Sequence, residues 1–237
     1  PLKYKVDELN NLRAQLKDSY AGKPKGQVFY ALADCSSQFK IPIEYFEDII
    51  EGVEIDLKKT RYQDFTELKS YCYKVASVVG LICINVFGYT RLEAKEYAIN
   101  LGLAMQLTNI IRDIKEDAEL GRIYIPLDEL SYFGYSEEEL IKGLETEAFY
   151  KLMSFQAKRA REYFAKGYLL MPLLPIRSRA CPAILAGIYS ALLDKIEREK
   201  FKVFHTRISL NLTKKLLIMI GLWIQSLCQL PKISEKL

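Results

Sequence analysis

The feature of this chain that most constrains its fold is a helical spacing of apolar residues, which persists along nearly its whole length. Apolar side chains recur at intervals of three and four, so that they share one face of a helix. Clear examples are Leu9, Leu12 and Leu16; Leu68, Cys72, Val75, Val79 and Ile82; and Tyr97, Leu101, Ala104 and Leu107. Strict alternation of apolar and polar residues, which is typical of strands, is nearly absent. The sequence therefore predicts an all-α protein.

The breaks between these runs are few, because Gly and Pro number only 12 and 8 among the 237 residues. They separate the predicted helices at residues 3–20, 25–39, 43–59, 64–87, 92–118, 136–142, 146–170, 175–199 and 213–228. Asp64 and Ser136 each supply a capping oxygen followed by early acidic residues, as at a helix start. No flexible linker divides the chain, so we expect residues 1–237 to form a single domain.

Composition excludes several classes of protein. The net charge of +4 is well short of the clustered basicity of a nucleic-acid binder. The five cysteines are odd in number and contain no C-x-x-C pair, so neither a disulfide framework nor a zinc site is indicated. His205 is the single histidine, which excludes a His-based triad. No stretch reaches the roughly 18–20 apolar residues of a membrane span, and we expect a cytoplasmic protein.

Oxygen-bearing side chains gather on one helix face near the end of the run 92–118. At 100° per residue they lie within about 40° of one another. The aligned residues are Gln106, Asp113 and Asp117, and Asn109 and Glu116 flank them. Carboxylates one turn apart repel each other, and the preceding turns are apolar, as in a buried helix, so this pair needs a compensating cation. Such ligands suit Mg²⁺, which also binds substrate phosphates.

Other charged residues are weaker candidates. Arg112 can donate to a phosphate from the side of the same helix. Three further candidate partners for a phosphate are Arg177, Arg179 and Arg207. An acidic group precedes three basic residues on another predicted helix, and we interpret it as a solvated charged face rather than a metal or phosphate site. Its members are Glu51, Glu54 and Asp56.

The oxygen-rich segment resembles a known family. Residues 106–117 read QLTNIIRDIKED and precede GRIYIP at 121–126; together they closely resemble the second aspartate-rich signature of the squalene/phytoene synthase family. Residues 71–80, YCYKVASVVG, and 51–62, EGVEIDLKKTRY, are similar to other segments of that family. The resemblance covers essentially the whole chain. It implies an all-α isoprenoid synthase bundle around a central apolar cavity, which joins two prenyl diphosphates head to head with Mg²⁺ between two aspartate-rich helices.

The resemblance also implies roles for individual residues. The metal ligands would be Asn109, Asp113 and Asp117. Residues near the diphosphates would be Gln106, Arg112 and Tyr124. The prenyl cavity would be lined by Tyr71, Val75 and Gly80. Catalysis would depend on Asp113, Asp117, Arg112 and Tyr71.

The first aspartate-rich motif of the family, D-x-x-x-D, is expected upstream of the segment that matches residues 31–34. Asp7 and Asp18 do not have that spacing. We therefore expect either that residues preceding Pro1 carry the motif or that the chain is a divergent member. A divergent member could act as a non-catalytic binding or assembly partner, which is one alternative to an enzyme.

Within the family, residues 71–81 and 87–89 most resemble the bacterial presqualene diphosphate synthases of hopanoid biosynthesis. The first expectation is therefore condensation of two farnesyl diphosphates to presqualene diphosphate, without NADPH. A phytoene synthase acting on geranylgeranyl diphosphate is the alternative enzyme. The apolar segment 214–228 exceeds one helix stripe, so we expect it either to pack on the domain, the more common role, or to contact a membrane surface peripherally.

Overall fold

The computed structural model describes residues 2–227, and within them the chain is helical with no strand. The all-α prediction is confirmed. The helices are α1 (Leu2–Tyr20), α2 (Gly26–Phe39), α3 (Ile43–Lys58), α4 (Phe65–Cys72), α5 (Val78–Phe87), α6 (Ala94–Arg112), α7 (Ile114–Glu119), α8 (Leu127–Phe133), α9 (Glu137–Ile141), α10 (Glu147–Tyr168), α11 (Ile176–Arg198) and α12 (Leu212–Leu227). A π-helical turn, η1 (Tyr73–Ser77), joins α4 to α5, and a 3₁₀ turn, η2 (Met171–Leu173), follows α10.

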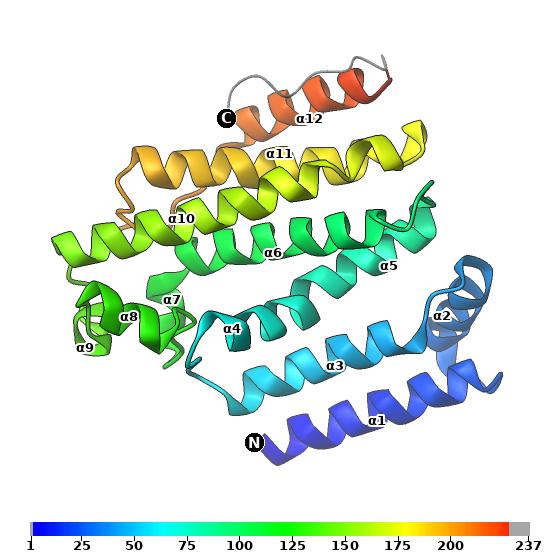
Figure 1. Cartoon of the computed structure of the whole chain (residues 1–237). Helices are drawn as coiled ribbons and strands as arrows, with labels where there is room; N and C mark the ends of the chain where they lie inside the picture. The colour runs from blue at the N-terminus through cyan, green and yellow to red at the C-terminus, as the bar shows by residue number, and fades with distance from the viewer. Residues whose placement is uncertain (1, 228–237) are drawn as a thin grey trace.

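The long helices lie side by side in an order close to their order in the chain. Figure 1 shows α1, α3, α4 with α5, α6, α10, α11 and α12 in succession, with α1 and α12 at opposite edges. The short helices α7, α8 and α9 gather at one end of this array. Contacts between neighbouring long helices account for most of the packing. The array therefore places the end of α6 next to the short helices and their loops.

Helix α6 is the centre of the core, because it packs on η1 and α5 on one side and on α10 on the other. Two glycines allow these close approaches. A Cβ on Gly102 would lie 2.6 Å from the Cα of Ser77, and one on Gly167 would lie 2.8 Å from the Cα of Leu101. Such distances to backbone atoms leave no room for a side chain. The oxygen-rich segment, residues 106–117, thus begins inside this buried helix and continues past its end.

The predicted helix boundaries were correct at both expected caps. The Asp64 side chain accepts a hydrogen bond from the amide of Glu67 at 2.9 Å. Ser136 forms a capping box with Glu139. The structure differs from the prediction in two places. The predicted helix 92–118 is interrupted at Asp113, and α8 was not predicted. Residue 228, the predicted end of the last helix, lies outside the described residues.

The continuous helical stretch Phe65–Phe87 is, by length and composition alone, apolar enough to cross a membrane. It is not a run of purely apolar residues, since it contains the charged residues Glu67, Lys69 and Lys74. The stretch lies inside the array, where η1 packs on both α3 and α6. A third of its most apolar part is buried, and packing in the core explains that part of its apolar character.

Candidate active site

The oxygen-rich face lies at a break between two helices. Helix α6 ends at Arg112, Asp113 has φ −99° and ψ 16°, and α7 begins at Ile114. Backbone hydrogen bonds cross the break in helical order: Asp113 N donates to Asn109 O at 2.8 Å, and Asp117 N donates to Asp113 O at 2.9 Å. The four-residue spacing is therefore kept, although the helix is not continuous.

Asp113 is neutralised by arginines of the same chain. The Arg112 Nε donates to Asp113 Oδ1 at 2.7 Å, and a second bond from the same guanidinium reaches Oδ2. Arg207, which is 94 residues further along the chain, donates its Nε to the same Oδ1 at 3.0 Å. Burial opposes ionisation, but these two guanidinium groups outweigh it and lower the pKa of Asp113. The compensating cations expected for the pair are thus supplied to Asp113 by the chain itself.

Asp117 has the opposite electrostatic environment. It makes no ion pair with any described residue. Burial, followed by the negative charge of Asp113, raises the pKa of Asp117 to about 6. Arg122 partly offsets these effects. Asp117 is thus the carboxylate whose charge remains uncompensated.

Two further oxygens near this carboxylate lack partners. Asn109 Oδ1 and Glu116 Oε2 are buried without a hydrogen-bond partner among residues 2–227. Asn109 does use its amide nitrogen, which donates to Gln106 Oε1 at 3.4 Å. Buried polar atoms are rarely left unpaired in a folded protein. These unpaired amide and carboxylate oxygens, beside the uncompensated carboxylate of Asp117, are suitable ligands for a hard cation such as Mg²⁺.

The fit has a limit, since the described residues contain no group of three or more His, Cys, Asp or Glu side chains placed to hold a metal. Mg²⁺ commonly takes only one or two carboxylates and completes its shell with waters and phosphate oxygens. The predicted set of Asn109, Asp113 and Asp117 is compatible with that mode. It stays a prediction.

A second cluster near the acidic turn is formed by residues of α3, of α4, of the loop that joins them and of the loop after α7. The Tyr124 hydroxyl donates to Asp56 Oδ1 at 3.0 Å, and the Tyr71 hydroxyl donates to the Tyr124 hydroxyl at 3.5 Å. The rings of Tyr71 and Tyr124 stack with centroids 5.4 Å apart, and Tyr62 packs against both. Burial raises the pKa of Tyr124 to about 12 and that of Tyr71 further still. Both hydroxyls therefore remain protonated donors.

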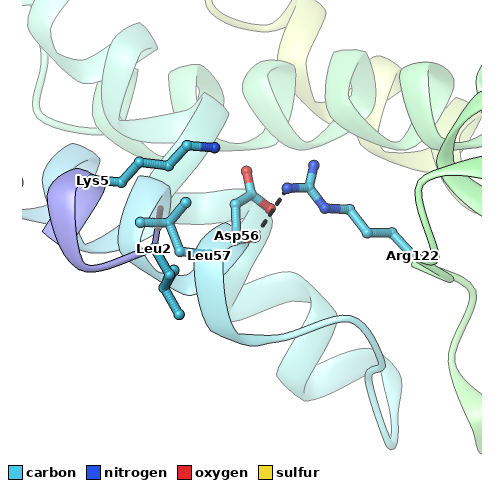
Figure 2. Close-up of a pocket in the computed structure, with 5 residues that line it drawn as sticks. All are labelled: Leu2, Lys5, Asp56, Leu57 and Arg122. Atoms are coloured by element: carbon cyan, nitrogen blue, oxygen red, sulfur yellow. Dashed lines mark hydrogen bonds between the residues drawn. The ribbon is translucent and has the colours of Figure 1, made fainter.

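Asp56 was not expected in the site, and the interpretation of its helix face as solvated is wrong for this residue. Figure 2 shows its side chain directed towards Arg122, whose terminal nitrogen donates to the Asp56 backbone oxygen at 3.0 Å. Lys5 and Leu2 of α1 complete a pocket of about 340 Å³ beside them. Glu54, by contrast, does lie on a charged face and pairs with Arg13 and with Lys58.

Arg122 interacts with both the acidic turn and the cluster around Asp56. Its guanidinium lies close enough to Asp117 to lower the pKa of that carboxylate, whereas Asp56 acts in the opposite direction. Its backbone amide donates to Asp117 O at 2.8 Å. Arg122 was not predicted as a site residue. Its position two residues before Tyr124, a predicted diphosphate-binding residue, is the sequence feature that could have indicated it.

A basic cavity of about 440 Å³ opens on the other side of Asp113. Its polar lining comes from Arg112, Arg207 and Lys215, and Tyr189 contributes a ring. Two of these cations already contact Asp113. An anion placed here would meet guanidinium groups, which bind phosphate oxygens in a bidentate manner. Among the three weaker arginine candidates, only Arg207 reaches the acidic turn; Arg179 donates to Leu174 O instead.

An apolar cavity of about 110 Å³ lies between α5, α6 and α11. Gly80 lines it, as predicted for the prenyl cavity. The other two predicted lining residues lie elsewhere. Tyr71 belongs to the tyrosine cluster, and Val75 faces Gly52 of α3, where an added Cβ would lie 2.8 Å from its Cγ1.

An all-α array whose central helix ends in acidic residues is the arrangement that the sequence resemblance implied. The pattern of the squalene/phytoene synthase family matches residues 2–214. The chain belongs to this family of prenyltransferases, which condense prenyl diphosphates head to head.

Curated relatives of the chain are phytoene synthases. It is 38% identical over 229 residues to the phytoene synthase of Arthrospira platensis, covering 90% of this chain and 74% of the relative. It is 40% identical over 217 residues to the chloroplastic phytoene synthase 1 of Zea mays, covering 89% of this chain and 53% of the relative. The chain thus spans about three quarters of the first relative and about half of the second.

Solved structures of the family share the fold. A dehydrosqualene synthase in complex with ligand superposes with a TM-score of 0.85 at 28% identity, covering 93% of this chain and 78% of the other. The squalene synthase HpnC from Alicyclobacillus acidocaldarius gives a TM-score of 0.80 at 26% identity, covering 83% and 74%. The predicted isoprenoid synthase fold is confirmed.

The finer expectation of a presqualene diphosphate synthase is not supported to the same degree. It rested on two short segments, residues 71–81 and 87–89. The alignments with phytoene synthases extend over about nine tenths of the chain. The relatives therefore favour the alternative enzyme.

Proposed function

We propose that the protein to which this chain belongs is a phytoene synthase, which condenses two molecules of geranylgeranyl diphosphate. The observation that carries the proposal is 36–40% identity to phytoene synthases from cyanobacteria and plants across most of the chain. The reaction begins when the allylic C–O bond of one substrate breaks and its diphosphate leaves. The resulting cation alkylates the double bond of the second substrate, and a proton is lost as the cyclopropylcarbinyl diphosphate forms. The second diphosphate then leaves, and rearrangement of that cation with loss of a second proton gives phytoene.

The basic residues bind and neutralise the leaving group. Arg112 and Arg207 present guanidinium donors to the cavity of about 440 Å³, where a diphosphate can take over bonds now made to Asp113. Preorganised cations of this kind stabilise charge that develops on departing oxygens. The magnesium that we propose at Asn109, Asp113 and Asp117 would supply a further positive charge to the same oxygens.

The tyrosine cluster orders the opposite wall of the site. Tyr71 and Tyr124 form a chain of donors that ends on Asp56, so their hydroxyls have fixed directions. Their rings pack on one another and on Tyr62, which holds the hydroxyls in place. The apolar cavity of about 110 Å³ between α5, α6 and α11 can receive part of a prenyl chain, in surroundings that keep water from the cation.

The test is product analysis with the complete protein, Mg²⁺ and either geranylgeranyl or farnesyl diphosphate, each with and without NADPH. We expect phytoene from the longer substrate without NADPH. Presqualene diphosphate from farnesyl diphosphate as the main product would overturn the proposal in favour of the first expectation. No product from either substrate, with the complete protein folded, would support the non-catalytic alternative.

A further inference from the structure

Two cysteines from distant parts of the chain line the same apolar cavity. Cys83 lies on α5 and Cys181 lies on α11, and both border the cavity of about 110 Å³. Neither forms a disulfide in this structure. The other two cysteines among residues 2–227, Cys35 and Cys72, do not line this cavity. The cavity therefore places one pair of free thiols on two of the helices that border it.

A hydrogen bond sets the register of these two helices. The Ser178 hydroxyl, in the first turn of α11, donates to Phe87 O, at the end of α5, at 3.2 Å. Helix α5 runs towards this contact and α11 runs away from it. Cys83 precedes Phe87 by four residues and Cys181 follows Ser178 by three, so each thiol lies one turn from the contact on the same helix face. The corresponding rises are about 6 Å and about 4.5 Å, which brings the two thiols to similar heights along the cavity.

The pKa of Cys83 also reflects the proximity of the two thiols. Burial raises the pKa of the Cys83 thiol, and the nearby Cys181 raises it further. Cys181 is exposed among the described residues, whereas Cys83 is only partly exposed. Cys181 is therefore the thiol that a small oxidant reaches first, and Cys83 is the thiol that stays protonated beside it.

Pro182 gives the first turn of α11 freedom to move. Because a proline inside a helix has no amide hydrogen, the carbonyl of Ser178 lacks its ordinary partner four residues ahead. The turn that carries Cys181 is thus tied less firmly to the rest of α11 than a regular helical turn is. A tilt of this turn towards α5 shortens the distance between the two thiols and narrows the cavity.

We propose that Cys83 and Cys181 are a redox-sensitive pair, which hydrogen peroxide oxidises to a disulfide that joins α5 to α11 across the cavity. Peroxide first oxidises the Cys181 sulfur to a sulfenic acid and releases water. The Cys83 sulfur then attacks the Cys181 sulfur, and the displaced hydroxide leaves with the Cys83 proton as water. Two thiols thus lose two electrons and two protons, and the peroxide becomes two waters. Disulfides that form in reducing compartments are commonly transient and redox-sensing.

The bridge closes the cavity to a prenyl chain, because it crosses the space that the chain would enter and holds the two helices together. This consequence rests on the proposed function, whereas formation of the bridge does not. Turnover should therefore be lost on oxidation and return when a dithiol reductant cleaves the bridge by thiol–disulfide exchange.

Peptide mapping detects the bridge directly. The complete protein is treated with hydrogen peroxide, its free thiols are alkylated, and it is digested with trypsin without reduction. Cleavage after Lys and Arg gives peptides 75–91 and 180–195, which contain Cys83 and Cys181 as their single cysteines. We expect these two peptides joined, from protein that remains a monomer on a non-reducing gel, and separated by dithiothreitol. Both peptides alkylated, or each joined to another cysteine, would overturn the proposal.

Matched variants separate the bridge from general oxidative damage. Cys83→Ser and Cys181→Ser should each abolish both the joined peptide and the loss of turnover on oxidation. Cys35→Ser on α2, which removes an exposed thiol outside the cavity, should keep both. A joined peptide with unchanged turnover would refute the closure of the cavity. If the reduced protein has no turnover with geranylgeranyl diphosphate, the proposed function fails, and the joined peptide still decides whether the two thiols pair.

Discussion

Replacing Asp117 by Asn should make the metal-free protein more stable at pH 8, although it removes a proposed ligand. The pKa of this carboxyl lies at about 6 in the folded chain, against an ordinary value of 3.8. Each pH unit corresponds to 1.36 kcal/mol, so the difference amounts to about 3 kcal/mol. Partial exposure to solvent screens the charge and reduces the expected effect to about 1–2 kcal/mol.

The sign of this effect depends on pH. Because the folded chain binds the Asp117 proton more tightly, the ionised carboxylate destabilises the fold fully above pH 6 and not at all below about pH 4. The gain from Asp117→Asn should therefore be present at pH 8 and shrink as the pH falls through 6. Urea unfolding followed by circular dichroism, with a chelator present, measures it at each pH.

Asp113→Asn is the matched control, since the two residues are one turn apart. The pKa of Asp113 is lowered by Arg112 and Arg207, so its carboxylate stabilises the fold above its ordinary pKa. Hydrogen bonds to charged groups contribute about 1.5–3 kcal/mol, and this variant should lose stability at pH 8. Both variants should lose turnover. Equal destabilisation by both at pH 8 would refute the assignment of Asp117 as the uncompensated carboxylate.

Four other variants test the packing and the site. Tyr124→Phe removes the hydroxyl that bonds the α3 carboxylate and should lower kcat at least tenfold, with far-ultraviolet circular dichroism unchanged. Gly102→Ala should cost about 1–3 kcal/mol in urea unfolding by overpacking, whereas Gly221→Ala, which meets nothing within 4 Å, should stabilise α12 by about 0.5–1 kcal/mol. Arg159→Met strands the buried Glu129 carboxylate and should lower stability by about 3–5 kcal/mol, as a lower urea midpoint.

Much of the fold was predictable because the signals that determine it are local. Apolar spacing identified the long helices, and capping side chains identified the starts of α4 and α9. The break at Asp113 left no such signal, since one non-helical residue inside a periodic run does not change the pattern. Helix α8 was missed although Pro126 precedes it and Gly134, with φ 65°, follows it. Those two residues mark its ends in the sequence.

Only those residues of the candidate site that lie close together in the sequence, on one helical face, could be predicted. Helix geometry brought Asn109, Asp113 and Asp117 to one face, and the backbone bonds across the break preserved that spacing. Asp56 was not predictable in this way, because the tyrosine that it binds is 68 residues away. Charged residues lie on either side of it in the sequence, at Glu54 and Lys58, which made a solvated face the natural interpretation.

The contact of Arg207 with Asp113 helps to explain why the pKa of Asp113 is lowered and that of Asp117 is raised. This arginine lies on the segment between α11 and α12, which is held by the buried side chains of Ile208 and Leu210 and by a bond from Lys195 to Ser209 O. The segment therefore links the charge state of the acidic turn to the position of α12. A displacement of α12 that moved this segment would withdraw a cation from Asp113 and raise its pKa. Ile208→Ala, which loosens this segment, should therefore shift the acidic limb of the pH profile of turnover to higher pH, and an unchanged profile would refute the link.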